Sequence, residues 1–344
     1  METFLGIDFP TWWFLVVGAV FSGYAILDGF DLGAGALHLF LKKEESRRIA
    51  LNAIGPVWDG NEVWLVIGGG ALFAGFPEVY ATVLSAFYIP FMLFLVMLIL
   101  RAVAIEFRSK EVMAWWRKTW DITYSVSSII ISLLLGVVLG NLIQGIPIDK
   151  NFEYTGTLGG LLNPFAMLTG ITTLSLFMMH GSIYLVMKTE KQLYTRLTQL
   201  VKATSQFFIA CYIALTMVTL VYIPHMAERF REHPVLFAVP ILTMLAVINI
   251  RRQIEKGKYM RAFISSALTP ALLLITVALN LFPDMVISSI DPANTINIYN
   301  GSSSILSLKI MLIIAAIGVP IVAIYTGFVF WTFRGKVKLD ETSY

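Results

Sequence analysis

Apolar runs long enough to cross a lipid bilayer recur about nine times in this chain, and they limit its fold more than any other feature. A bilayer core takes ~20 helical residues. The runs lie near 11–41, 50–73, 79–100, 119–143, 164–187, 203–224, 234–250, 262–282 and 308–333. Hydrophobic residues make up 57% of the sequence and charged residues 14%, far from the balance of a soluble domain. We therefore expect an all-α polytopic membrane protein, with nine transmembrane helices in a single subunit over 1–344.

Basic residues alternate along the chain and predict its orientation, because Lys and Arg accumulate in cytoplasmic loops. Most of the 25 Lys and Arg residues fall near 42–48, 101–118, 188–202, 251–261 and 334–338. The alternate connections contain only Lys150, Arg229 and Arg231, with Lys309 at the entrance of the last helix. This pattern predicts an outside N-terminus and a cytoplasmic C-terminus. No basic residue precedes the first apolar run, so we expect no cleavable signal peptide and a retained first helix.

Four carboxylates interrupt the first two apolar runs. Asp28 and Asp31 lie in LDGFDLGAG, and Asp59 and Glu62 lie in GPVWDGNEVW. Along a straight helix, Asp59 would lie ~16 Å beyond Arg48, about half of a ~30 Å hydrocarbon core. The same reasoning places the first pair at a similar depth, and each pair has the i, i+3 spacing that shares a helix face. The two acidic faces are therefore predicted to meet near the membrane midplane.

Such acids suit proton transfer, because ionisable groups inside a membrane are costly and tend to be functional. Without a matching base, repulsion and desolvation should keep some of the four protonated. The alternative is that they are neutral, hydrogen-bonded residues that join helices packed through small side chains. Asp59 is the strongest candidate, whereas Asp31 and Glu62 are weaker. We expect Arg101, Glu106, Arg108 and Asp121 to lie near the cytoplasmic boundary, where ion pairing or snorkelling explains them.

The few histidines and the single cysteine limit which haem, metal and disulfide sites the chain could form. His180 could contact a proton, a quinone oxygen or a metal, although a structural hydrogen-bonded role is the alternative for both His180 and His38. These are the only two histidines within predicted helices, so at most one bis-histidine haem site could form. Cys211 has no partner for a disulfide or a cysteine-based metal site. We therefore expect no metal site and no catalytic residue in this chain, and we identify no cofactor-binding residues.

Several motifs together resemble subunit II of the bacterial cytochrome bd quinol oxidases. They are DGFDLGAG, GPVWDGNEVWLVIGGGALFAGFPEVY, FRSK, LGNLIQGIP, LLNPF and HGSIYLVMKT. The resemblance implies two four-helix bundles plus a peripheral helix, in a haem-free subunit that stabilises a haem-bearing subunit I. Haems b and d belong to that partner. The complex would perform an electrogenic reaction in the cytoplasmic membrane, oxidising quinol and reducing oxygen to water with cytoplasmic protons.

The resemblance carries one residue role to this chain. In some family members the aspartate of the W-D-G motif, here Asp59, contributes to the proton route towards the haems. At the position of Glu62, related sequences can have Gln. The family also implies an accessory small membrane subunit and a structural quinone in some members, and no nucleic-acid partner. A proton-coupled secondary transporter is the competing function, because it would also place acids near the midplane.

Overall fold

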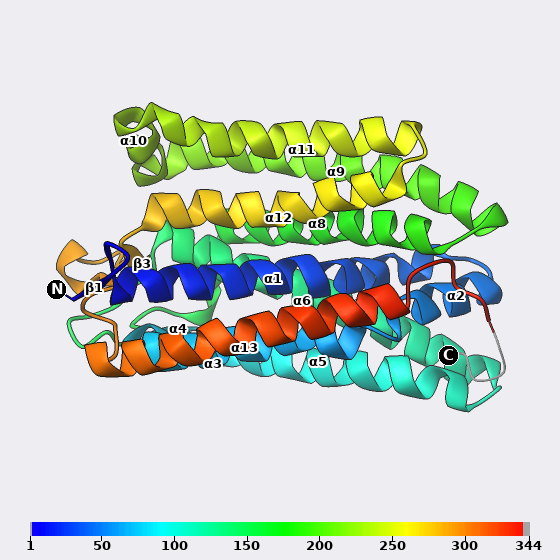
Figure 1. Cartoon of the computed structure of the whole chain (residues 1–344), viewed down its shortest axis with the longest axis horizontal. Coiled ribbons are helices and arrows are strands. Elements are labelled where there is room, and N and C mark those ends of the chain that lie inside the picture. The colour runs from blue at the N-terminus through cyan, green and yellow to red at the C-terminus, as the bar shows by residue number, and fades with distance from the viewer. Residues whose placement is uncertain (1, 340–344) are drawn as a thin grey trace.

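The computed structural model describes residues 2–339, apart from the side chains at 191, 192, 224, 225, 227 and 229, and it is almost entirely helical (Figure 1). Two short antiparallel strand pairs lie at one end, β1 (Thr3–Phe4) with β2 (Ile7–Asp8) and β3 (Asp284–Val286) with β4 (Ile296–Asn297). The α-helices are α1 (Phe9–Leu37), α2 (Glu44–Ile54), α3 (Trp58–Gly75), α4 (Pro77–Ala86), α5 (Tyr88–Phe107), α6 (Ala114–Gln144), α7 (Leu158–Leu161), α8 (Pro164–Lys188), α9 (Lys191–Tyr222), α10 (Pro224–Glu232), α11 (Ala238–Glu255), α12 (Tyr259–Leu281) and α13 (Ile305–Thr332).

Eight helices within the described residues are long and apolar enough to cross a membrane. They correspond to eight of the nine predicted runs. The exception is the run near 50–73, where α3 is 18 residues long and has Asp59, Asn61 and Glu62 in its first turns. Those polar side chains lower the mean hydropathy of a helix that is otherwise rich in Val, Leu, Ile and Gly.

The prediction of one continuous helix over 50–73 was wrong. Amphipathic α2 ends at Ile54, and α3 begins at Trp58. Pro56 lies between them and has no backbone N–H to continue the helical hydrogen bonds, and the backbone leaves the helical conformation at Val57 (φ −126°, ψ −23°). Asp59 therefore lies in the first turn of a new helix, and its depth cannot be measured along a straight helix from Arg48.

The predicted helix over 79–100 is also divided. The chain forms α4 and α5, which meet at Phe87 (φ −100°, ψ 24°). Pro90 follows closely and cannot donate the helical hydrogen bond that would join the two segments. Beyond residue 100, α5 continues to Phe107, so Arg101 lies within the helix rather than after it.

Other helix ends extend past the predicted apolar runs. The run at 203–224 is part of α9, which begins at Lys191, and the run at 119–143 is part of α6, which begins at Ala114. The short run at 234–250 becomes a 3₁₀ turn followed by α11, which continues to Glu255. Hydropathy marks only the apolar portion of a helix, whereas backbone hydrogen bonding continues into its polar ends.

Helix α8 lies at the centre of the molecule. It packs against α1, α6, α9 and α12, and it is the most buried of the eight spans. Helices α1 and α8 approach closely because glycines meet: a Cβ on Gly33 would overlap the Phe177 carbonyl oxygen, and one on Gly181 would overlap the Ala34 nitrogen. By contrast, α13 lies across the outside of α1 and α3 and is the least buried span (Figure 1).

Candidate functional site

Arg101 brings two predicted acids together inside the helix bundle. Its side chain extends from α5 and is 1% exposed. Its Nη2 donates to Asp28 Oδ1 of α1 at 2.7 Å and to Glu62 Oε2 of α3 at 3.0 Å. Three helices are thus joined by one guanidinium and two carboxylates. The expectation that the acids lack a matching base was wrong, whereas the ion pairing expected of Arg101 is confirmed.

Asp31 joins the same region through an amide. Asn61 of α3 donates from Nδ2 to Asp31 Oδ2 at 2.7 Å and to the carbonyl oxygen of Leu27 at 3.3 Å. The Tyr124 hydroxyl of α6 lies 3.5 Å from the Asp31 carbonyl oxygen and donates to it. The i, i+3 spacing of Asp28 and Asp31 therefore does direct both acids towards α3, as the sequence predicted.

Asp59 lies apart from this buried group. Its side chain is exposed on the surface of the chain, and the structure records no hydrogen bond or ion pair for it among the described residues. Glu62 is intermediate, with 21% of its side chain exposed, and Asp28 is fully buried. The structure thus brings together three of the four predicted acids, and exposure decreases from Asp59 to Glu62 to Asp28.

Several buried polar atoms around Arg101 lack hydrogen-bond partners within the described chain. They are Arg101 Nε and Nη1, Asp28 Oδ2, Asp31 Oδ1 and the hydroxyl of Tyr24. Unpaired buried groups are rare in proteins. The region around Arg101 is therefore polar, buried and incompletely paired within the described chain.

His180 forms hydrogen bonds through both ring nitrogens. Its Nε2 lies 3.0 Å from the Ile26 carbonyl oxygen of α1, and its Nδ1 lies 2.8 Å from Ser266 Oγ of α12. Because a carbonyl only accepts, Nε2 carries the proton. The ring is fully buried and stacks on Phe263. His180 therefore connects α1, α8 and α12, which matches the structural alternative stated for it.

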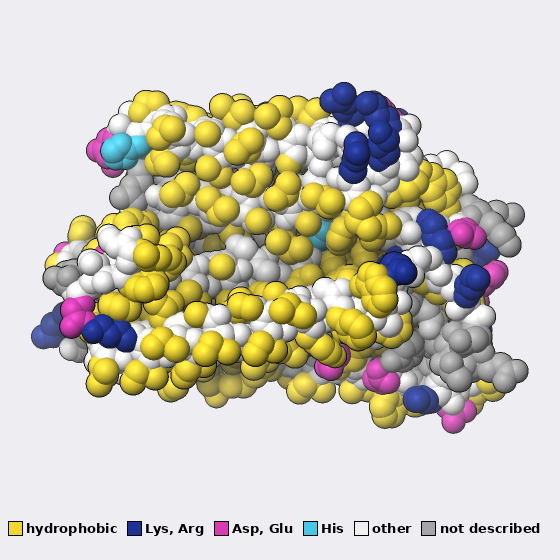
Figure 2. Space-filling model, in the orientation of Figure 1, with side chains coloured by type: hydrophobic (Ala, Val, Ile, Leu, Met, Phe, Trp, Pro, Cys, Tyr) yellow, Lys and Arg dark blue, Asp and Glu magenta, His cyan; other side chains and the backbone are white. Residues whose placement is uncertain are grey.

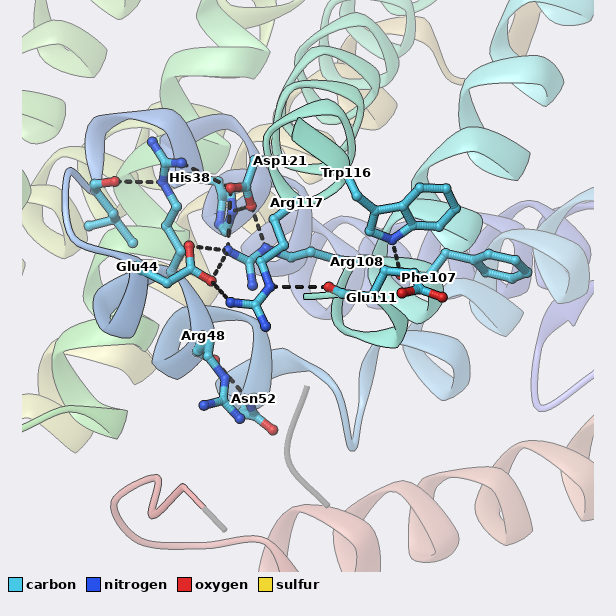
Figure 3. A network of polar contacts seen from close by, with 12 residues as sticks. His38, Glu44, Arg48, Asn52, Phe107, Arg108, Glu111, Trp116, Arg117 and Asp121 are labelled. Atoms are coloured by element: carbon cyan, nitrogen blue, oxygen red, sulfur yellow. Dashed lines mark hydrogen bonds and ion pairs between the residues drawn. The ribbon is translucent and has the colours of Figure 1, made fainter. Parts of the chain in front are cut away.

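A second polar network lies where α1, α2, α5 and α6 meet, close to the C-terminal end of α1 (Figure 3). Buried Asp121 of α6 accepts hydrogen bonds from His38 Nε2 at 2.5 Å, Arg108 Nε at 2.5 Å and Arg47 Nη1 at 2.9 Å. Arg108 Nη2 also donates to both oxygens of Glu44 at the start of α2, at 2.9 and 3.0 Å. The expected ion pairing of Arg108 and Asp121 is confirmed, and the network fixes α2 immediately before α3.

An apolar groove runs between α1, α3 and α13. It encloses about 370 Å³, and its lining includes Trp13, Val20, Trp64, Gly70 and Met311. All of its lining side chains are apolar or small, so the groove is suited to an elongated apolar molecule.

Metal binding finds no support in the described part of the chain, which contains no group of three or more His, Cys, Asp or Glu residues arranged to hold an ion. The Nε2 atoms of His38 and His180 are both engaged by protein acceptors. Neither ring therefore offers Nε2 to a haem iron in this conformation.

Comparison with known proteins identifies the relatives of this chain. The sequence model of the family described as cytochrome bd terminal oxidase subunit II matches residues 9–333. Cytochrome bd-I ubiquinol oxidase subunit 2 of Escherichia coli K12 is 33% identical, over 96% of this chain and 95% of that protein. Cytochrome bd ubiquinol oxidase subunit 2 of Bacillus subtilis is 34% identical, over 96% of this chain and 97% of that protein.

A solved structure has the same fold. It is a chain of the bd oxidase from Geobacillus thermodenitrificans, with a TM-score of 0.79 and 16% identity, covering 94% of this chain and 98% of that chain.

Proposed function

We propose that this chain, which belongs to the cytochrome bd terminal oxidase subunit II family, stabilises a haem-bearing subunit I and carries protons towards it. Membership of that family makes the chain an integral cytoplasmic-membrane subunit of a quinol:oxygen oxidoreductase. Haems b and d would belong to that partner. The engaged Nε2 atoms of His38 and His180 support a haem-free role for this subunit. A small accessory membrane subunit would complete the assembly.

We propose nine transmembrane segments, with α3 joining the eight apolar spans despite its polar first turns. Packing supports one bundle of α1, α3, α5 and α6, a second of α8, α9, α11 and α12, and a peripheral α13. The N-terminus would lie outside and the C-terminus in the cytoplasm. Lys and Arg accumulate on the cytoplasmic side of a membrane protein, and here they gather at the end of the molecule where α11 turns into α12. The N-terminus lies beside the strand pairs at the opposite end of the molecule, so the two termini would lie on opposite sides of the membrane (Figures 1 and 2).

The buried carboxylates that share Arg101 are the observation that carries the proton role. Asp28 and Glu62 compete for one Nη2, and Asp31 lies beside them with an amide rather than a cation as its partner. Two buried aspartates and the partly buried Glu62 thus lie around one guanidinium, an arrangement that favours retention of a proton because an uncompensated charge is costly in this environment. The group can thus accept or release a proton while Arg101 limits the change in local charge.

The gradient of exposure supports a direction for transfer. Exposed Asp59 would collect a proton and pass it to Glu62, one turn further along α3. When the Glu62 carboxylate gains that proton it becomes neutral, so its pair with Arg101 weakens and the guanidinium favours Asp28. Release of the proton towards Asp31, whose side-chain partner is the Asn61 amide rather than a cation, restores the Glu62 carboxylate.

A structural quinone, if this chain holds one, fits the groove between α1, α3 and α13. Trp13, Val20 and Met311 would hold its apolar tail. His180 is not proposed to contact this quinone, because both of its ring nitrogens are already hydrogen-bonded and its side chain does not line the groove. Extraction of the purified complex, followed by identification of quinones retained in the wild type and lost in Gly70→Trp, which fills the groove, tests this assignment.

Purification from native membranes tests the main proposal. The chain should copurify with a haem-bearing partner, and the preparation should show quinol-dependent oxygen uptake. A chain isolated without such a partner, and without that activity, would instead support the proton-coupled transporter.

Asp59→Asn tests the proton role. The substitution removes a titratable group from an exposed site, so oxygen reduction should slow while assembly and haem content stay unchanged. Glu62→Gln can still hydrogen-bond to Arg101 but cannot pass a proton onward, so it should slow turnover to a similar extent. Normal turnover in Asp59→Asn would exclude Asp59 from the route, and loss of the whole complex would favour a structural role for this residue.

A further inference from the structure

A basic cavity lies where α8 ends, α12 begins and the C-terminal segment returns to the bundle. It encloses about 550 Å³ and is open to the surface. Its lining comprises Met187, Gly257, Lys258, Tyr259, Met260, Arg261 and Lys336. The three cations come from two separate parts of the chain, and the lining includes no carboxylate. This cavity therefore differs from the acid-rich region around Arg101.

The C-terminal segment holds one cation of the cavity in place. Lys336 Nζ donates to the carbonyl oxygens of Thr189 at 2.8 Å and Val186 at 3.4 Å, and Val337 N donates to Lys188 O at 2.9 Å. Partial burial lowers the pKa of Lys336, although the charge of Glu190 opposes this effect. A bound anion would favour the charged form of the same ammonium group.

The other two cations lie around the first turn of α12. Lys258 and Arg261 are exposed, and neither has an ion-pair partner among the described residues. No side chain caps this helix, so the first-turn N–H groups have no side-chain acceptor. Gly257, with φ +66°, turns the chain between α11 and α12. An anion at this position would thus meet two mobile cations beside the favourable end of a long helix.

Apolar side chains on the same cavity indicate what kind of anion it binds. Met187 is half-buried, and Met260 is 59% exposed beside the apolar spans of α8 and α12. The surrounding surface is strongly basic, with Lys and Arg gathered at this end of α11 and α12 (Figure 2). A soluble phosphate would use only the cations, whereas a lipid would also place its glycerol and acyl carbons against the methionines.

We propose that this cavity binds the phosphate of an anionic phospholipid from the cytoplasmic leaflet. Basic pockets at the cytoplasmic ends of transmembrane helices are suited to such headgroups. The proposal does not depend on the oxidase role, because the cavity is separate from the acids and from the groove between α1, α3 and α13.

The test compares two variants that each lose two exposed positive charges. Lys258→Gln/Arg261→Gln changes the cavity, whereas Arg252→Gln/Lys256→Gln changes the neighbouring basic surface outside its lining. The intact complex is placed in nanodiscs of phosphatidylcholine with increasing phosphatidylglycerol, and bound phosphatidylglycerol is counted by native mass spectrometry. A hydrogen bond to a charged group contributes about 1.5 kcal/mol or more, so loss of two such contacts to the phosphate should weaken binding about 100-fold. The control should retain most of its affinity.

Equal losses in the two variants would overturn the proposal, because they would indicate diffuse surface charge rather than a site. Inorganic phosphate supplies a second arm: it should not displace phosphatidylglycerol at matched concentration, and displacement would assign the cavity to a soluble anion. Lys336→Arg keeps the third charge and should preserve binding. Loss of binding in Lys336→Arg, with unchanged melting temperature, would also contradict a site built on charge.

Discussion

The Arg101 group makes a quantitative prediction about stability. Asp28→Asn/Glu62→Gln removes both carboxylates that contact the guanidinium, at 2.7 and 3.0 Å, and leaves a buried cation. Breaking a buried ion pair by removing one side typically costs about 3–5 kcal/mol, because the remaining charge stays desolvated without compensation. We expect the double variant to lose about that much free energy of unfolding.

A third substitution separates charge compensation from packing. Adding Arg101→Met removes the cation from the same site while keeping a long apolar side chain. The triple variant should therefore recover most of the lost stability, since replacing a whole buried ion pair with apolar groups is often neutral. A model in which each polar side chain contributes independently predicts the opposite, that the triple variant is the least stable.

Unfolding of the purified complex by SDS titration, followed by near-ultraviolet circular dichroism, supplies the measurement. Arg251 and Glu255 provide the control, because their N···O distance is also 3.0 Å but their side chains are 75% and 65% exposed. Breaking that pair should cost only about 0.3–0.5 kcal/mol. A double variant within about 1 kcal/mol of wild type, or a triple variant less stable than the double, would refute the reasoning.

Three further predictions follow from the packing and the polar contacts. Gly33→Ala should prevent close approach of α1 and α8 and greatly reduce the yield of assembled complex, whereas Gly69→Ala, which has open space for a Cβ, should assemble normally. Asp121→Asn removes the negative charge that buried Arg108 and His38 contact, so the free energy of unfolding should fall by about 3–5 kcal/mol and the melting temperature with it. An unchanged melting temperature would contradict this prediction. His180→Ala should cost about 1–3 kcal/mol from unpaired hydrogen-bonding groups while leaving the haem spectrum of the complex unchanged, and a shifted spectrum would instead indicate haem contact.

Local sequence patterns were sufficient for the class of the protein. Hydropathy located eight spans that the structure also contains, because membrane-crossing helices need long apolar runs whatever their tertiary contacts. The i, i+3 spacing also predicted that Asp28 and Asp31 share one face of α1. The break between α2 and α3 had a visible signal in Gly55-Pro56, but the apolar residues on both sides concealed it.

The residues that form the candidate site together could be identified only from the tertiary structure. Arg101 is 73 positions from Asp28 and 39 from Glu62, and no local pattern reports such contacts. Charge patterning grouped Arg101 with its basic neighbours, whereas the fold buries it within α5 beside Asp28 and Glu62.

The sequence by itself determined eight segments that are long and apolar enough to cross a membrane, and the acids that interrupt the apolar runs, since both depend on the chemistry of neighbouring residues. Only the tertiary structure decided that Asp59 faces outward while Asp28 and Glu62 share a cation. Those outcomes depend on where α3 restarts and on how α1, α3 and α5 are rotated against each other, which close packing of distant helices determines.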